Sequence, residues 1–173
     1  MAVVIIATSG AIDANSYVTL AEANTYFESV LHGGSWTGAV DDDTRNRALV
    51  MATKRIDQED FYGDRETSTQ SLKFPRDNLG YLDGIYLDGT IPIQLKEAQY
   101  ELAKHLIDVN MNQLGTTGGQ TKSIQIGSLK KSSSVDENDN TTYSYDTLPP
   151  FVEASLTDLS SSINSGGQID VSR

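Results

Sequence analysis

The chain has 173 residues, a hydrophobic share of 38%, a formal net charge of −11 and no cysteine. Disulfides, thiolate metal sites and cysteine nucleophiles are therefore excluded, and the acidic balance disfavours phosphate binding, which draws on clustered Lys and Arg, as the main function. The length allows one core with an extension. The apolar start carries no preceding basic residue and is too short for a signal peptide or a membrane span, so we expect an N-terminal arm over residues 1–18.

The first helical pattern begins at Thr19. Thr19 and Glu22 have the spacing of a capping box, which satisfies main-chain N–H groups at a helix start. Apolar residues then follow at helical spacing: Leu20, Ala23, Phe27 and, as alternatives, Val30 or Leu31. This pattern predicts a helix with one buried face, ended by the glycines at 33 and 34.

A second helix is expected to begin within residues 41–43, three aspartates that suit the positive end of a helix, and to run to about Gln58. Its inward residues are Leu49, Ala52 and Ile56. Residues 59–89 are rich in turn signals. Asp-Gly pairs at 83–84 and 88–89 flank three apolar residues, which predicts a short hairpin or an ordered loop.

The longest helix should run from Pro92 to about Leu114 and end at Gly115. It carries two apolar stripes, one of Leu95, Ala98, Leu102, Leu106 and Val109, the other of Ile93, Tyr100, Ile107, Met111 and Leu114. Two stripes on one helix indicate burial on two sides. We therefore expect this helix at the centre of a bundle.

Residues 115–121 have the composition of a flexible linker. Alternating patterns over 123–131 and 142–146, separated by a polar, acidic stretch over 132–140, predict a β-hairpin with a long loop. Such a hairpin is too small to be stable alone and must pair with or lie against something else. The acidic loop is expected to be solvated, with a weakly held divalent cation as the alternative.

The prolines at 149 and 150 open a last helix, with Phe151, Val152, Leu156 and Leu159 at helical spacing. The predicted fold class is mainly α (α+β): a helical bundle with a β-hairpin extension and a C-terminal helix. The expected organisation is an arm over 1–18, a bundle over 19–114, a linker and hairpin over 115–147, a helix packing on the bundle over 148–161, and a flexible tail over 162–173.

No motif in the sequence indicates catalysis. His32 and His105 belong to different predicted helices, and no Gly-x-Ser-x-Gly elbow is present. Glu97 and Glu101 share a helix face, but Lys104 lies three residues on, which favours a surface charge cluster over an acid–base pair. The chain is expected to be neither an enzyme nor a carrier of a metal or cofactor.

The order of four segments resembles the head–tail connector (adaptor) proteins of tailed phages, a family also labelled DnaT-like single-stranded DNA-binding domains. The segments are SYVTLAEANTYF at 16–27, LKFPR at 72–76, IP at 91–92 with Ala98 and ELA at 101–103, and LPPFVE at 148–153. The resemblance covers roughly residues 15–160 and implies a structural subunit without catalytic residues or cofactors.

The resemblance further implies a ring of about twelve copies in the neck of the virion, assembled in the bacterial cytoplasm. It implies no membrane partner. Its partners would be the portal protein, a tail or nozzle protein, and genomic DNA passing through without sequence-specific binding. Alternatives are a tail-completion or neck protein and, in another class, a single-stranded DNA-binding accessory protein.

Two sets of contact residues are expected for such an adaptor. Portal contacts are predicted in the tail, at Ile163, Gln168, Ile169, Asp170, Val171 and Arg173. Contacts with a neighbouring subunit or the tail are predicted in the hairpin, at Ile124, Ile126, Leu129, Lys130, Lys131, Tyr143 and Tyr145.

Overall fold

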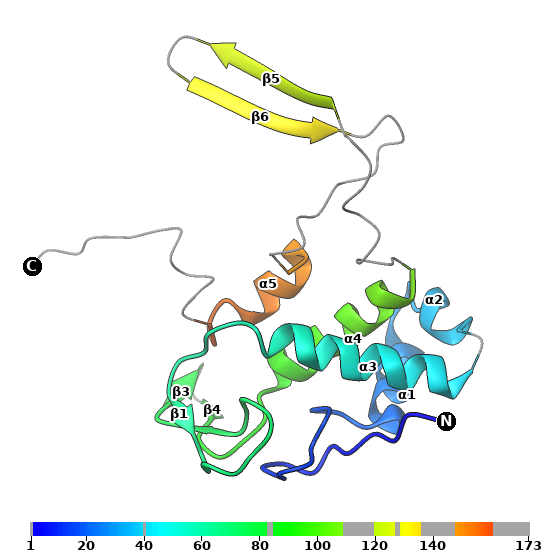
Figure 1. Ribbon diagram of the computed structural model, residues 1–173, viewed down its shortest axis with the longest axis vertical. Helices are drawn as coiled ribbons and strands as arrows, with labels where there is room; N and C mark the ends of the chain where they lie inside the picture. The colour runs from blue at the N-terminus through cyan, green and yellow to red at the C-terminus, as the bar shows by residue number, and fades with distance from the viewer. Residues whose placement is uncertain are drawn as a thin grey trace, which may run out of the picture. The chain divides into compact units, whose positions relative to one another are not determined.

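The structure is a computed structural model that describes residues 2–39, 41–82, 85–108, 120–126, 129–135 and 148–160. It divides into two units, one formed by Met1–Val109 with Leu148–Arg173 and the other by Asn110–Thr147. The first unit holds helices α1 (Leu20–Ser29), α2 (Gly34–Thr37), α3 (Asp42–Ile56), α4 (Ile93–Asp108) and α5 (Pro150–Leu156) (Figure 1). The predicted fold class, mainly helical with a hairpin and a C-terminal helix, is confirmed. In the described part of the chain, no helix has the length and apolar character needed to cross a membrane.

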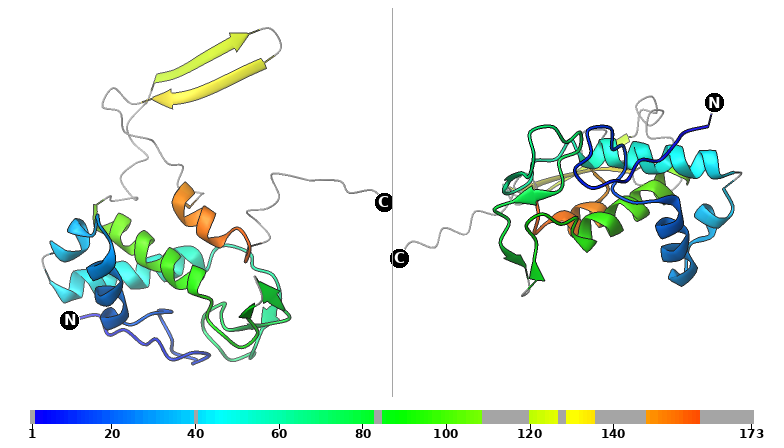
Figure 2. Two further views of the ribbon diagram at one scale, coloured as in Figure 1. Left: turned by 180° about the vertical axis from the view of Figure 1, so that it is seen from behind. Right: turned by 90° about the horizontal axis from the view of Figure 1, so that it is seen from below.

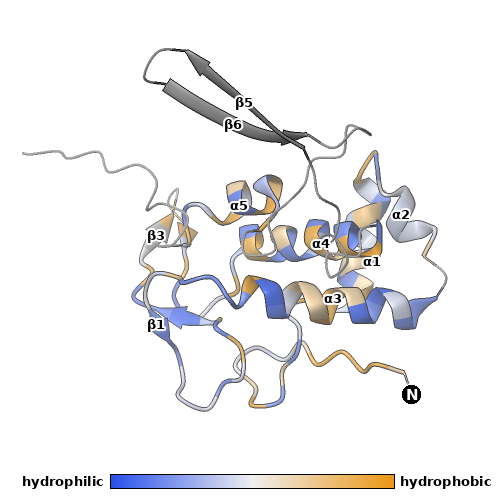
Figure 3. Ribbon diagram, turned by 45° about the horizontal axis from the view of Figure 1, so that its top comes forward, coloured by the Kyte–Doolittle hydropathy of each residue, from blue (hydrophilic) through white to orange (hydrophobic). Residues whose placement is uncertain are grey.

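Short antiparallel strands complete the two units. In the first, β1 (Asp64–Arg65) pairs with β2 (Arg76–Asp77), and β3 (Tyr81–Leu82) pairs with β4 (Ile85–Tyr86). In the second, β5 (Gln120–Ile126) pairs with β6 (Leu129–Val135). Figure 3 shows that β1 is hydrophilic, in keeping with its exposed Asp-Arg sequence.

The capping box at the start of α1 is present as predicted. The Thr19 side chain accepts a hydrogen bond from the Glu22 main-chain N–H, and the Glu22 carboxylate accepts one from the Thr19 N–H at 2.7 Å. Phe27 is buried as expected; of the two alternatives at the end of the stripe, Val30 packs against the core, whereas Leu31 is 89% exposed. The reason is that α1 ends at Ser29, before the predicted glycine stop.

Helix α2 was not predicted from the sequence. Its Trp36 is buried, stacks on Phe27 with ring centroids 4.9 Å apart, and donates from Nε1 to Asn24 Oδ1 at 2.9 Å. A helix of one turn has no sequence periodicity of its own. It is stabilised by the burial of the indole ring against α1.

Helix α4 lies at the centre of the first unit and packs against α3 and α5 (Figures 1 and 2). Leu95, Ala98 and Leu102 are fully buried, which confirms most of the first predicted stripe. On the second stripe Tyr100 is buried, whereas Ile93 is exposed and was wrongly placed in the core. The expected end of this helix, from 109 to 114, lies outside the described residues.

A buried amide joins three segments of the bundle. Gln99 of α4 is fully buried, and its Oε1 accepts a hydrogen bond from the Tyr17 main-chain N–H at 3.2 Å. Its Nε2 donates to Ser16 Oγ at 2.7 Å and to the Leu49 carbonyl of α3 at 3.1 Å. Every polar atom of the amide is therefore satisfied by another segment of the chain.

A second buried polar contact closes the end of α3. The Tyr17 hydroxyl donates to Oδ1 of Asp57, the C-cap residue of α3, and Asp57 Oδ2 accepts from the Lys73 main-chain N–H at 3.2 Å. Burial raises the pKa of the Asp57 carboxyl, which the tyrosine hydroxyl and the Lys73 amide partly offset. The Tyr17 ring also meets Phe74 edge to face, with centroids 6.1 Å apart.

The N-terminal segment lies on α3. The Val3 main-chain N–H donates to Asp43 Oδ1 at 2.6 Å, and Asn46 Nδ2 of the same helix donates to the Val3 carbonyl at 3.0 Å. Farther on, the Asn15 side chain bonds the main chain at Val4 and Ile6 and folds the segment back on itself. These contacts hold the N-terminal segment against α3.

We expect Gln99→Leu to lower the free energy of unfolding by about 1–3 kcal/mol, because the buried Tyr17 N–H loses its acceptor without any large change in volume. Chemical denaturation of the two proteins measures this difference. Gln58→Leu, at an exposed glutamine, is the matched control and should stay within about 0.5 kcal/mol of the parent. Equal losses in the two variants would contradict the structural role of the buried amide.

We expect Tyr17→Phe to cost about 1.5–3 kcal/mol, because it removes the hydroxyl donor to a buried carboxyl. The folded-state pKa of Asp57 lies above its unfolded value, so the stability it contributes is present at acid pH and is lost as pH rises through the folded pKa. Removing the donor raises that pKa further. The deficit of the variant should therefore be larger at neutral than at acid pH, and Tyr62→Phe should show no such trend.

Candidate interaction surfaces

An apolar groove opens between the β3–β4 hairpin and the start of α4. It has a volume of about 310 Å³ and is lined by residues 82, 85–87 and 90–94. Ile85, Tyr86 and Ile93 are 60%, 53% and 55% exposed, while Leu87 at the base is buried. The volume lies at the lower end of the range of about 300–1,000 Å³ for small-molecule sites, and the groove is open, so it suits a few side chains of another protein surface better than a cofactor.

Asp88 holds one wall of the apolar groove. Its Oδ1 accepts from the main-chain N–H groups of Leu79 and Gly80 at 2.8 and 3.0 Å, and its Oδ2 accepts from the Tyr86 hydroxyl at 2.8 Å. The Gly80 amide and the Tyr86 hydroxyl hold the pKa of Asp88 below its ordinary value. The exposed Tyr86 ring is thus fixed by a hydrogen bond rather than by burial.

Arg76 anchors the loop beneath the apolar groove. Its guanidinium is largely buried and donates to the carbonyls of Tyr62, Phe61 and Gly63, and its own carbonyl accepts from the Gly89 N–H at 2.9 Å. Gly89 has φ of 69°, a left-handed conformation that favours glycine. The loop that carries Ile85 and Tyr86 is therefore tied to the rest of the first unit by main-chain contacts.

The apolar groove belongs to an acidic stretch of sequence. Between residues 77 and 95 the chain contains Asp77, Asp83 and Asp88 but no lysine or arginine. A partner that combines apolar residues with positive charge would match this stretch best.

The β5–β6 hairpin is the second candidate surface. Its register pairs Ile126 with Leu129, Ile124 with Lys131, Lys122 with Ser133 and Gln120 with Val135 on one face. The three intervening pairs place only Thr, Ser, Gln and Lys on the other face. The four apolar residues of the strands thus share one face with Gln120, Lys122, Lys131 and Ser133, and the hairpin is amphipathic in this sense. Its strands carry Lys122, Lys130 and Lys131 but no acidic residue.

The predicted pairing of strands 123–131 and 142–146 across a long loop is wrong. The second strand is Leu129–Val135, so residues 132–135 belong to a strand instead of a loop. Only Gly127 and Ser128 separate the two strands in sequence, and a two-residue Gly-Ser connection is itself a hairpin signal. The rest of the expected loop and the stretch 142–146 lie outside the described residues.

Some of the predicted contact residues can be placed. Ile124 and Ile126 lie in β5, and Leu129, Lys130 and Lys131 lie in β6. Outside the described residues are Tyr143 and Tyr145, and all the predicted portal contacts, Ile163, Gln168, Ile169, Asp170, Val171 and Arg173. The apolar groove was not predicted as a site, although Ile85 and Tyr86 between two Asp-Gly pairs were a usable signal.

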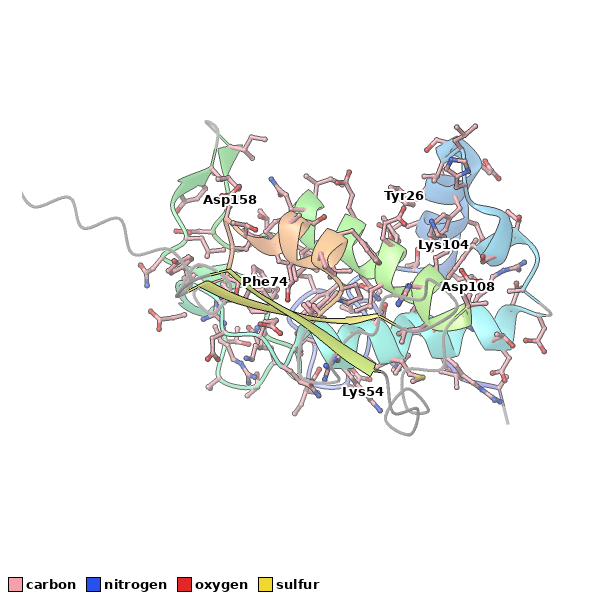
Figure 4. All side chains as sticks on the ribbon, turned by 90° about the horizontal axis from the view of Figure 1, so that it is seen from above. Tyr26, Lys54, Phe74, Lys104, Asp108 and Asp158 are labelled. Atoms are coloured by element: carbon pink, nitrogen blue, oxygen red, sulfur yellow. The ribbon has the colours of Figure 1, made fainter. Side chains whose placement is uncertain are left out.

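Basic side chains of the first unit are mostly engaged within the chain. The ion pairs are Arg45–Asp42, Arg47–Asp43, Lys73–Asp60, Lys96–Glu22 and Lys104–Glu101. The last pair confirms the expected surface cluster. Glu101 also accepts a hydrogen bond from the hydroxyl of Tyr26, a residue of α1 that Figure 4 shows close to Lys104 of α4. The first unit therefore offers few uncommitted cations to a nucleic acid.

The described side chains give no indication of a metal centre. Among them no group of three or more His, Asp or Glu could hold a metal ion. His105 meets Phe151 of α5 edge to face at 5.6 Å, and burial lowers its pKa. His32 lies beyond the end of α1 and is exposed, so the structure places the two histidines on separate elements.

The described residues define a mostly helical protein with short antiparallel strand pairs and a C-terminal helix. A family model described as "Putative DnaT-like ssDNA binding protein" matches residues 1–173, and the chain belongs to this family. No curated protein and no solved structure matches the chain.

We expect Asp88→Ala to loosen the wall of the apolar groove, because the Leu79 and Gly80 amides lose their common acceptor. Hydrogen exchange of these two amides should become faster, while amides of α3 keep their protection. In the parent the folded pKa of Asp88 is lowered, so its contribution persists at neutral pH and disappears as pH falls through that pKa. Asp13→Ala, at an exposed carboxyl, is the control, and equal effects on the two amides would contradict this account.

Proposed function

We propose that this protein is a structural head–tail adaptor of a tailed bacteriophage, forming a ring that joins the portal to the tail and lets DNA pass. The observation that carries the proposal is the amphipathic β5–β6 hairpin, which belongs to the second of the two units, Asn110–Thr147. An isolated two-stranded hairpin is marginally stable in water, so its apolar face is best explained by burial in an assembly. The sequence resemblance to connector proteins supports the same role.

The charge of the chain supports a passage for DNA. The net charge is −11, and five of the nine basic side chains described in the first unit are paired with carboxylates. A ring wall of this sign repels phosphates and lets DNA slide without sticking. The proposed location is the virion neck, with assembly in the bacterial cytoplasm.

The proposed portal contact is the tail over residues 162–173. Deleting it should abolish co-purification with the portal protein but leave the helical circular-dichroism signal intact, because α1 to α5 end before it. A chain whose tail is replaced by a Gly/Ser segment of equal length separates the effect of sequence from that of length. Undiminished portal binding by either variant would refute this role of the tail.

A tail-completion or neck protein is the runner-up of the same class. Electron microscopy of the protein mixed with its portal distinguishes the two. An adaptor should give rings seated directly on the portal, whereas a protein one step farther from the capsid should not associate with the portal alone.

Single-stranded DNA binding is the second candidate function, and the family description supports it rather than a connector role. In this case the lysines of β5 and β6 are the proposed phosphate contacts. Each phosphate neutralised on a single strand contributes about −0.7 to the slope of log K against log salt, so three contacts predict a slope of roughly −2.

Fluorescence titration of a labelled oligothymidylate tests this function. Binding near 50 mM salt that weakens with the expected slope and is lost in K122A/K130A/K131A would establish it. Lys54→Ala, at an exposed lysine of α3, is the control and should bind like the parent. No binding at that salt concentration would remove single-stranded DNA binding from consideration.

A further inference from the structure

We propose that the apolar groove between β3–β4 and α4 receives the apolar face of the β5–β6 hairpin of a second copy of this chain. The inference rests on the proposed assembly function and adds to it the two surfaces that meet. It gives the hairpin a specific binding site on a neighbouring copy of the same chain.

The first argument is chemical complementarity of the apolar surfaces. The groove exposes Ile85, Tyr86 and Ile93 around a buried base, which leaves apolar area in contact with water. By its register, the hairpin face carries Ile124, Ile126, Leu129 and Val135, with Lys122 and Lys131 among them. Burying both surfaces against each other removes apolar area from water, which favours the contact.

The second argument is charge. The groove lies in a stretch with three aspartates and no basic residue between 77 and 95, whereas the hairpin strands carry three lysines and no acidic residue. Two chains of net charge −11 repel each other as wholes. The strands of the hairpin have a positive balance, and the groove is an apolar surface within a sequence stretch of the opposite sign.

The third argument is symmetry. The groove and the hairpin are different surfaces, so the contact is heterologous: each copy offers a groove to one neighbour and a hairpin to the other. Such contacts close into a ring when the rotation between copies allows it and otherwise continue as a filament. A ring of the kind proposed above needs a contact of this type.

The cysteine-free chain allows a direct test. Ile85→Cys places a thiol in the groove of one protein, and Ile126→Cys places a thiol on the apolar hairpin face of the other. The two full-length proteins, one of which carries a mass tag, are mixed and oxidised. Because each cysteine is on a separate chain, a mixed disulfide reports only contact between copies. Leu31→Cys, also highly exposed, replaces the groove position in one control, and Gln125→Cys, on the opposite hairpin face, replaces the hairpin position in the other.

We expect the Ile85–Ile126 pairing to form in about tenfold excess over either control pairing, which corresponds to about 1.4 kcal/mol of preference. The excess should shrink at high salt and in a hairpin with K122E/K130E/K131E. Equal yields in all pairings would overturn the inference. If the yields are equal but the protein still binds the portal, the adaptor function stands and only this contact is refuted. If the Ile85–Ile126 disulfide forms in excess but the protein does not bind the portal, the contact stands and the adaptor function is refuted.

Discussion

The amide of Gln99 is the interaction on which the arrangement of the bundle depends. It is fully buried and satisfied by the N-terminal segment at Ser16 and Tyr17 and by the Leu49 carbonyl of α3. Apolar contacts tolerate small slips of one helix along another, but a slip here would leave a buried N–H or C=O without a partner. The amide therefore selects one register of α4 against the rest of the bundle.

That register explains why the apolar groove exists. Successive helix residues are rotated by about 100°, so Ile93 lies about 200° from the fully buried Leu95, on the opposite side of α4. One heptad on, Tyr100 returns to the side of Ile93, but its ring is covered by Tyr26 of α1 at 4.6 Å between centroids. Helix α1 thus covers one end of this side of α4, and the other end remains exposed beside β4.

The elements with long periodic patterns and capping residues were predictable from the sequence. The Thr19–Glu22 capping box and the buried face of α3 follow from local chemistry, and the structure confirms them. Helix α2 and the exposure of Ile93 were not predictable, because they depend on which segments meet in space. The hairpin pairing was predictable from the turn signal Gly127-Ser128. The polar, acidic stretch after it also has the composition of a loop, and it led to the wrong pairing.

The lysines of β5 and β6 connect the two proposed functions. Single-stranded DNA and the groove of a second copy would both draw on Lys122, Lys130 and Lys131, the three cations of the β5 and β6 strands. Occupation of the hairpin by one partner must weaken the other, and linkage requires the effect to be equal in both directions. DNA binding and self-association by this chain are therefore expected to compete, and a ring assembled through the hairpins would present phosphates with an acidic surface from which these lysines have been withdrawn.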